Sequence, residues 1–268
     1  MQHALIIGLL ASFACGIIGT YVVVKKIGYI SGGISHAVLG GMGIAYFLGK
    51  NPIHGAIIAA IVAAVIIGMV NLKARQKEDT IIGAIWAIGM AIGIIFISKT
   101  PGYNADLMSY LFGNILLVTK SDLMMILVLD LVIFAIVLLF FRQFLAVSFD
   151  EEYAKIQGMK VEFIYLLLLC LIAVTVVILI QVVGLILVIA LLTLPAAIAG
   201  HYSRTLSGMM LLASILGIIF TTTGLWVSYN ANLPTGATII LIAGSVFLLS
   251  SIFKNMLFRF KSAKNNSS

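Results

Sequence analysis

Charged residues are scarce in this chain: Asp, Glu, Lys and Arg make up only 9% of the 268 residues, whereas hydrophobic residues make up 62%. The few charges are separated by apolar runs of about 20 residues, the length that a helix needs to cross a bilayer. So little polar sequence leaves no room for a separate soluble domain. The sequence therefore predicts an all-α, polytopic membrane protein with one membrane domain over residues 1–260.

Catalytic motifs are also missing. The sequence has no phosphate-binding G-x-x-x-x-G-K-[ST] loop, no H-E-x-x-H zinc motif and no G-x-S-x-G nucleophile elbow. The two cysteines, Cys15 and Cys170, lie inside apolar runs without metal-ligand spacing, so we interpret them as packing residues. The chain is not expected to be an enzyme. If it transports a solute, the energy comes from another subunit or from an ion gradient.

Charges, prolines, asparagines and glycine clusters divide the apolar sequence into about nine candidate spans. An odd number of spans places the two termini on opposite sides of the membrane. The boundary near residue 181 is the least sharply marked. The spans cover residues 4–24, 27–49, 53–72, 80–98, 122–141, 162–180, 183–200, 207–229 and 235–254.

The basic residues predict the orientation of the chain. If the N-terminus is outside and the C-terminus is cytoplasmic, then of the 16 Lys and Arg residues only Lys50, Lys99 and Lys120 lie outside. The net charge of +7 is thus mainly a topology signal, and no nucleic-acid partner is expected. The connection 99–121 is predicted to be external and to form an interfacial or half-inserted helix. The tail 261–268 is predicted to be a disordered cytoplasmic segment.

One polar segment, SFDEEYAKIQGMK (148–160), interrupts the apolar sequence and is cytoplasmic in this topology. Ser148 and Glu151 have the spacing of a capping box, and Gly158 is suited to a left-handed helix stop. The segment is therefore predicted to be a short amphipathic helix. Its shape alone fits either an ordinary solvated loop helix or a helix that docks into a soluble partner. Its apolar face consists of Phe149, Tyr153 and Ile156.

Only two ionisable residues lie clearly in the middle of a span, His36 and Asp130. Each costs about 2.5 to 3.5 kcal/mol near the bilayer centre, so each calls for an explanation. His36 lies in a glycine-rich span and could bind a divalent cation transiently or form a hydrogen bond across a helix interface. Asp130 could bind a cation, carry a proton or pair with a neighbouring helix. A proton- or sodium-coupled transporter that uses both groups is the alternative function.

Five segments, taken together and in order, resemble the zinc/manganese/iron permease family of ATP-binding-cassette importers. They span nearly the whole chain. The segments are ISHAVLGG (34–41), LMSYLFGNILLVTKSDL (107–123), SFDEEYAKIQGM (148–159), VGLILVIALLTLPAAIA (183–199) and LPTGATIILIAG (233–244).

The resemblance implies a homodimeric permease subunit in a bacterial cytoplasmic membrane. Two cytoplasmic ATPase subunits bind ATP below it, and an extracytoplasmic metal-binding protein docks above it. The cargo is a divalent zinc, manganese or iron ion, and no permanently bound cofactor is implied. The segment 148–160 then corresponds to the helix that couples the permease to its ATPase. The implied coupling residues are Phe149, Asp150, Glu151, Tyr153, Ala154, Ile156 and Gly158.

The chain departs from the family pattern at one position. The residue four before the histidine is commonly aspartate in this family, which puts both side chains on one helix face. Here that residue is Gly32, so His36 lacks its usual partner and Asp130 is a candidate replacement from another span. We also expect Gly32, Gly40 and Pro195 to contribute to gating, since glycine permits close helix approach and proline bends a helix.

Overall fold

The structure is a computed structural model that describes residues 2–73, 78–100, 115 and 118–265. Within these residues nine helices are long and apolar enough to cross a membrane, which confirms the predicted number of spans. The helices are α1 (Gln2–Val24), α2 (Gly28–Phe47), α3 (Pro52–Lys73), α4 (Glu78–Ser98), α6 (Lys120–Leu139), α7 (Phe141–Phe149), α8 (Glu151–Ile156), α9 (Val161–Val183), α10 (Leu185–Tyr202), α11 (Leu206–Ala231) and α12 (Thr235–Asn265).

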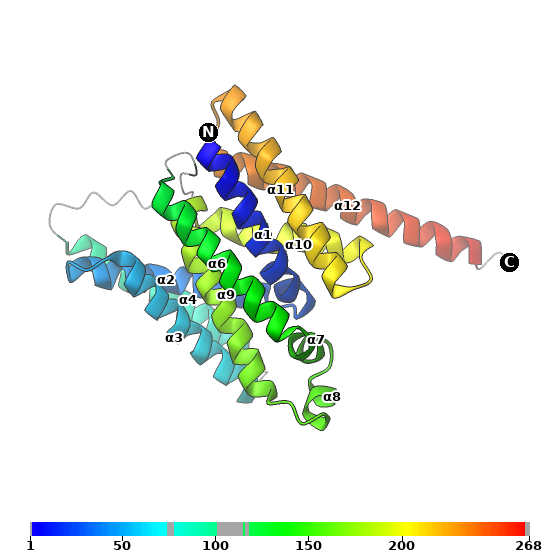
Figure 1. The fold of residues 1–268 in the computed structure, drawn as a ribbon, viewed down its shortest axis with the longest axis horizontal. Helices are drawn as coiled ribbons and strands as arrows, with labels where there is room; N and C mark the ends of the chain where they lie inside the picture. The colour runs from blue at the N-terminus through cyan, green and yellow to red at the C-terminus, as the bar shows by residue number, and fades with distance from the viewer. Residues whose placement is uncertain (1, 74–77, 101–114, 116–117, 266–268) are drawn as a thin grey trace.

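Helix α1 lies inside the bundle and packs on α6, α9, α10 and α11 (Figure 1). Beside it, α2 is sandwiched between α3 and α4 and also contacts α9. Two short helices, α7 and α8, lie together at the end of the bundle opposite the N-terminus (Figure 1). The fold therefore consists of a membrane-length bundle with one small helical unit at its end.

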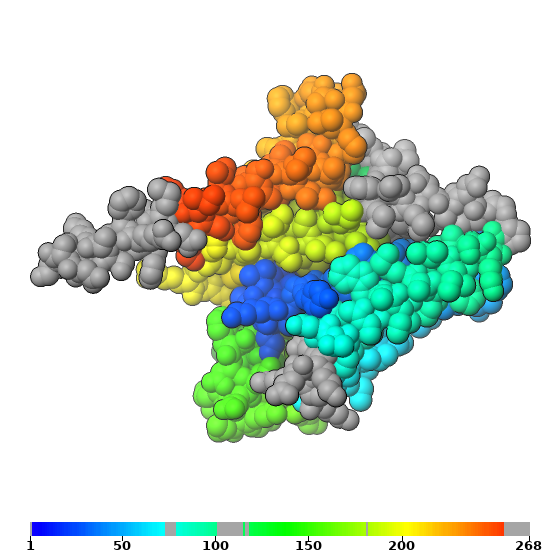
Figure 2. All heavy atoms as spheres, turned by 180° about the vertical axis from the view of Figure 1, so that it is seen from behind, coloured from blue at the N-terminus to red at the C-terminus, as the bar shows by residue number. Residues whose placement is uncertain are grey.

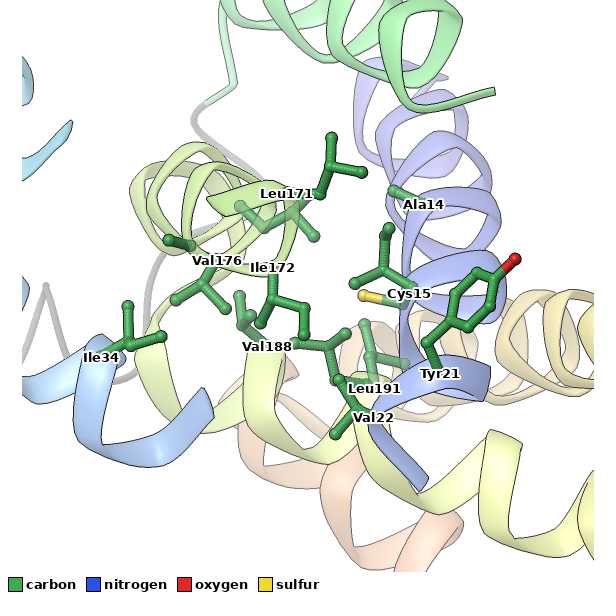
Figure 3. Packing of buried hydrophobic residues seen from close by; sticks show 14 of the residues in the cluster. Ala14, Cys15, Tyr21, Val22, Ile34, Leu171, Ile172, Val176, Val188 and Leu191 are labelled. Carbon is green, nitrogen blue, oxygen red and sulfur yellow. The ribbon is translucent and has the colours of Figure 1, made fainter. Parts of the chain in front are cut away.

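The centre of the bundle is packed with branched apolar side chains from helices far apart in the sequence. Figure 3 shows Cys15 and Val22 of α1 facing Ile172 of α9 and Leu191 of α10. All of these side chains are almost completely buried. Such interdigitated packing at the density of protein interiors holds α1, α9 and α10 together.

The boundary between the sixth and seventh spans is a single residue, Gly184. Its φ of 85° is in the left-handed region, which favours glycine. It ends α9 at Val183 and lets α10 begin at Leu185, so the boundary that was least sharp in the sequence lies a few residues later than expected.

Helix α12 lies along α10 on one side of the bundle (Figure 2). It continues to Asn265, within the segment 261–268 that was predicted to be a disordered tail. The sequence KSAKN contains no glycine or proline, and Lys and Ala favour helix, so nothing in it stops α12. Residues 266–268 lie outside the described part of the chain. Most of the predicted external connection 99–121, including its interfacial helix, also lies outside it.

Candidate functional site

His36 lies on α2 and faces α4. Its half-buried imidazole stacks on the indole ring of Trp86, with 4.0 Å between ring centroids and an interplanar angle of 10°. The indole Nε1 of Trp86 donates to Sδ of Met90, at 3.2 Å, which orients the indole ring. The imidazole is therefore held in a defined plane by an aromatic neighbour that the sequence analysis did not identify. The one signal for it was a tryptophan in the middle of an apolar span.

Nδ1 of His36 is buried and has no hydrogen-bond partner among the described residues. A buried imidazole nitrogen without a partner has an available lone pair or N–H, so the ring is not held by a hydrogen bond to a neighbouring helix at this atom. This observation favours a ligand role over the cross-helix hydrogen bond that the sequence also allowed. The described residues contain no cluster of three or more His, Cys, Asp or Glu side chains suited to a closed metal site.

The backbone around His36 is brought together by glycines. A Cβ atom placed on Gly40 would lie 2.8 Å from the backbone oxygen of Gly89 on α4, so only glycine allows this approach of the two helices. At Gly32, by contrast, the nearest atom to such a Cβ is Cζ3 of Trp86, at 3.9 Å. A side chain at Gly32, on the same helix face as His36, would thus meet Trp86 in ordinary contact and without a clash.

Asp130 lies in a different part of the molecule. It is 4% exposed on α6, which packs on α1 and α9, and Phe13 and Phe134 contact each other across the α1–α6 interface at 6.1 Å. Neither carboxylate oxygen of Asp130 has a hydrogen-bond partner among the described residues. The structure therefore does not join Asp130 to His36, and Asp130 does not replace the missing aspartate as a bonded partner.

An apolar groove of about 680 Å³ runs between α2, α3 and α4. Its floor is formed by small residues of α2, including Ala37 and Gly41, and its polar lining residues are Lys50 and His54. His36 does not line it. Pro195, the other predicted gating residue, is buried inside α10, and the helix continues on both sides of it.

The predicted coupling segment forms two helices instead of one. Ser148 belongs to α7, and Asp150 is the N-cap of α8, where its carboxylate accepts from the backbone N–H of Tyr153 at 2.9 Å. The predicted capping box of Ser148 and Glu151 is therefore wrong. Asp150 adopts an extended conformation (φ −150°, ψ 99°) that breaks the helix, and aspartate is among the preferred N-cap residues. Gly158, with a φ of 76°, follows the end of α8 as expected.

The outward face of α7 and α8 is apolar. Phe149 is 68% exposed, Tyr153 is 54% exposed and Ile156 is 83% exposed, whereas Ala154 is completely buried against the bundle. These side chains lie outside the nine candidate spans. Large exposed apolar side chains in a polar segment are typical of a surface that a partner covers.

The nine membrane-length helices of the described residues, with a histidine in a glycine-rich span and an exposed helical unit at one end, define a polytopic membrane protein. Residues 1–254 match the ABC 3 transport family, and the chain belongs to this family. The members of this family are membrane permease subunits of ATP-binding-cassette systems, and the chain is such a subunit.

Similar proteins have been named for metal transport. A probable metal transport system membrane protein of Chlamydia trachomatis is 46% identical over 91% of this chain and 85% of that protein. The manganese transport system membrane protein MntC of Listeria monocytogenes is 38% identical over 94% of this chain and 90% of that protein. Among solved structures, PsaBC from Streptococcus pneumoniae in complex with Fab matches with a TM-score of 0.83 and 36% identity, over 93% of this chain and 90% of that chain.

Proposed function

We propose that this chain is the permease subunit of an importer for divalent transition-metal ions, with manganese as the first candidate cargo and zinc or iron as alternatives. Separate ATPase subunits bind and hydrolyse ATP and drive alternating access. The proposal rests on membership of the ABC 3 transport family and on the similarity to MntC and PsaBC. Residues 1–260 act as one permease domain in the cytoplasmic membrane of a bacterium.

The observation that carries the coupling role is the exposed apolar face of α7 and α8, formed by Phe149, Tyr153 and Ile156. An amphipathic helix whose apolar face points away from its own protein suits a groove on a partner. Asp150 caps the N-terminus of α8, and Glu151 adds a negative charge to its first turn. Gly158, with a positive φ, lets the chain turn after α8. The partner that we propose for this surface is the ATPase subunit.

The orientation follows from the side on which α8 lies. Lys25, at the end of α1, contacts Glu151, so the end of the first span and α8 share one side of the membrane. The excess of Lys and Arg on that side supports a cytoplasmic location for α8 and the C-terminus, with the N-terminus outside. A second copy of the chain and an extracytoplasmic metal-binding protein complete the proposed importer.

The cargo is a substrate that passes through and is not retained. The half-buried imidazole of His36, which keeps part of its surface exposed, is the mid-span group best placed to contact it. One imidazole without a surrounding ligand cluster binds a cation weakly, which is what release during transport requires. We propose His36 as a transient ligand. Gly32, Gly40 and Pro195 are proposed to shape the path and its gating.

The test uses proteoliposomes that contain the permease, its ATPase and the binding protein. We expect ATP-dependent Mn²⁺ uptake that disappears when the ATPase is omitted and that persists with an ionophore. A Tyr153→Cys variant should cross-link to a cysteine in the ATPase groove, whereas a cysteine at exposed Leu241, within the last span, should not. Uptake without the ATPase that collapses with the ionophore would instead establish the ion-coupled alternative.

A further inference from the structure

Lys25 is a lysine whose side chain is almost completely enclosed. It follows the last residue of α1, and its side chain is only 9% exposed. Nζ donates to the backbone oxygen of Val147 on α7 at 2.8 Å and to Oε1 of Glu151 on α8 at 2.6 Å. Lysine is among the residues least often buried unless paired, so this geometry marks a built interaction and not a chance surface contact.

A third helix completes the enclosure of Lys25. Nζ lies 5.2 Å from the ring centroid of Tyr165 on α9, a cation–π contact. Lys25 therefore connects the end of the first span to α7, α8 and α9, across more than 120 residues of sequence. Beside this cluster is a polar cavity of about 450 Å³, lined by the α1–α2 turn, Asn71 and the α7–α8 junction. The cavity leaves space on one side of this connection.

The segment after Lys25 links it directly to the candidate site. Lys26 has a φ of 60°, and the backbone N–H of Ile27 donates to the carbonyl of Val22 at 2.9 Å. This hydrogen bond ties the start of α2 to the end of α1 through a tight turn. Helix α2 begins at Gly28 and carries His36 on its third turn. A displacement of Lys25 therefore moves the start of the helix that carries the proposed metal ligand.

A second ion pair on the same unit provides a reference. Lys155 and Glu162 lie 3.4 Å apart, both are 57% exposed, and the pair spans only the α8–α9 turn. Exposed pairs of this kind are screened by water and contribute little. The Lys25–Glu151 pair, with side chains 9% and 25% exposed, instead connects elements that are distant in sequence. Removal of Glu151 leaves the enclosed ammonium of Lys25 with the Val147 carbonyl and the Tyr165 ring but without this carboxylate.

We propose that Lys25 and Glu151 form the connection through which a displacement of α8 reaches the α1–α2 turn and His36. Both are positioning residues, and the inference rests on the proposed function of α8 as the ATPase-docking helix. When the ATPase shifts α8, the carboxylate of Glu151 moves with it, and the enclosed ammonium of Lys25 follows. The exposed apolar face binds the ATPase, and this pair transmits the motion.

The test compares E151Q and K25M with the exchanged pair K25E/E151K and with the conservative variant E151D. Each variant is assembled with the ATPase and the binding protein in proteoliposomes. Three quantities are measured: co-purified ATPase, ATP hydrolysis and Mn²⁺ uptake. We expect Mn²⁺ uptake per ATP hydrolysed to fall at least about tenfold in both E151Q and K25M. The co-purified ATPase is the separate measure of docking. E151D should recover much of this ratio, whereas the exchanged pair should not, because its carboxylate at position 25 would face the Val147 carbonyl and the Tyr165 ring. The control variant K155M/E162Q should match the wild type.

Each outcome decides one of the two proposals. If E151Q and K25M transport as much Mn²⁺ per ATP as the wild type, the connection is not used and only this inference is overturned. If the variants lose bound ATPase together with uptake, the pair serves docking instead of transmission, which also overturns it. If the wild-type complex itself shows no ATP-dependent uptake, the proposed function fails first. If K25M does not fold, E151Q alone decides the test, because in E151Q the Lys25 side chain keeps its hydrogen bond to the Val147 carbonyl.

Discussion

His36 and Asp130 are both ionisable groups in the middle of a span, yet the structure gives them different surroundings. His36 is half-buried, stacked on Trp86 and bordered by glycines, whereas Asp130 is 4% exposed beneath the α1–α6 interface. Each has a buried polar atom without a hydrogen-bond partner among the described residues. The unsatisfied atom alone therefore does not identify a transport ligand. The greater exposure of the imidazole distinguishes His36 from Asp130.

The strongest test of this difference is His36→Ala. We expect ATP-dependent Mn²⁺ uptake in proteoliposomes to fall by about tenfold or more. Removing a residue that only supports a metal ligand typically lowers metal affinity by about that factor, and removing the ligand itself should cost at least as much. ATPase assembly should not change, since His36 lies on α2 and not on α7 or α8. The control is His54→Ala, an exposed histidine in the first turn of α3. Uptake that stays at the wild-type level in His36→Ala would remove His36 from the path.

The second test concerns the close approach of α2 and α4. Gly40→Ala introduces a Cβ that meets the backbone oxygen of Gly89, and backbone cannot move aside as a flexible side chain can. We expect the free energy of unfolding to fall by about 1 to 3 kcal/mol, the usual cost of overpacking. Thermal unfolding in detergent measures it. Gly244→Ala is the matched control, because nothing lies within 4 Å of that Cβ. Equal melting temperatures for the two variants would contradict the close contact.

The third test restores the carboxylate that the family commonly has. Gly32→Asp places an oxygen ligand one helical turn before His36, in space bounded by Trp86 at 3.9 Å. Carboxylate oxygen suits manganese, so we expect the Mn²⁺ concentration for half-maximal uptake to fall by about threefold. Gly32→Asn has nearly the same shape without the charge and should not produce this gain. A rise in the required Mn²⁺ concentration would show that position 32 is not part of the metal path.

Much of this architecture could be predicted from the sequence because bilayer thickness imposes a length on every apolar helix. The spans, the Gly158 stop and the outward apolar face of α8 follow from local patterns of this kind. The Asp150 cap was missed because two residues, Ser148 and Asp150, competed for one cap and the backbone conformation decided between them. Local patterns resolve such competition poorly.

The contacts made by Lys25 and Trp86 could not be predicted for a different reason. Lys25 was interpreted as a topology signal, and its partner Glu151 lies 126 positions away. Trp86 stacks on His36 from another span. Only tertiary packing brings such residues together, and no periodic pattern in a single sequence indicates which distant residues will be in contact. The same limit explains why Asp130 was considered as a partner for His36.

The smallest expected effect comes from Asp130→Asn. Asparagine keeps the volume of the side chain and removes a group whose ionised form is costly in an apolar interface that supplies no hydrogen bond from the described residues. We therefore expect uptake within about twofold of the wild type and an equal or higher melting temperature in detergent. Asp122→Asn is a useful contrast, because Asp122 completes the capping box of α6 with Thr119 and its loss should lower the melting temperature. A strong loss of uptake in Asp130→Asn, with normal folding, would instead assign Asp130 a part in moving protons or metal. The accessibility argument that separates it from His36 would then fail.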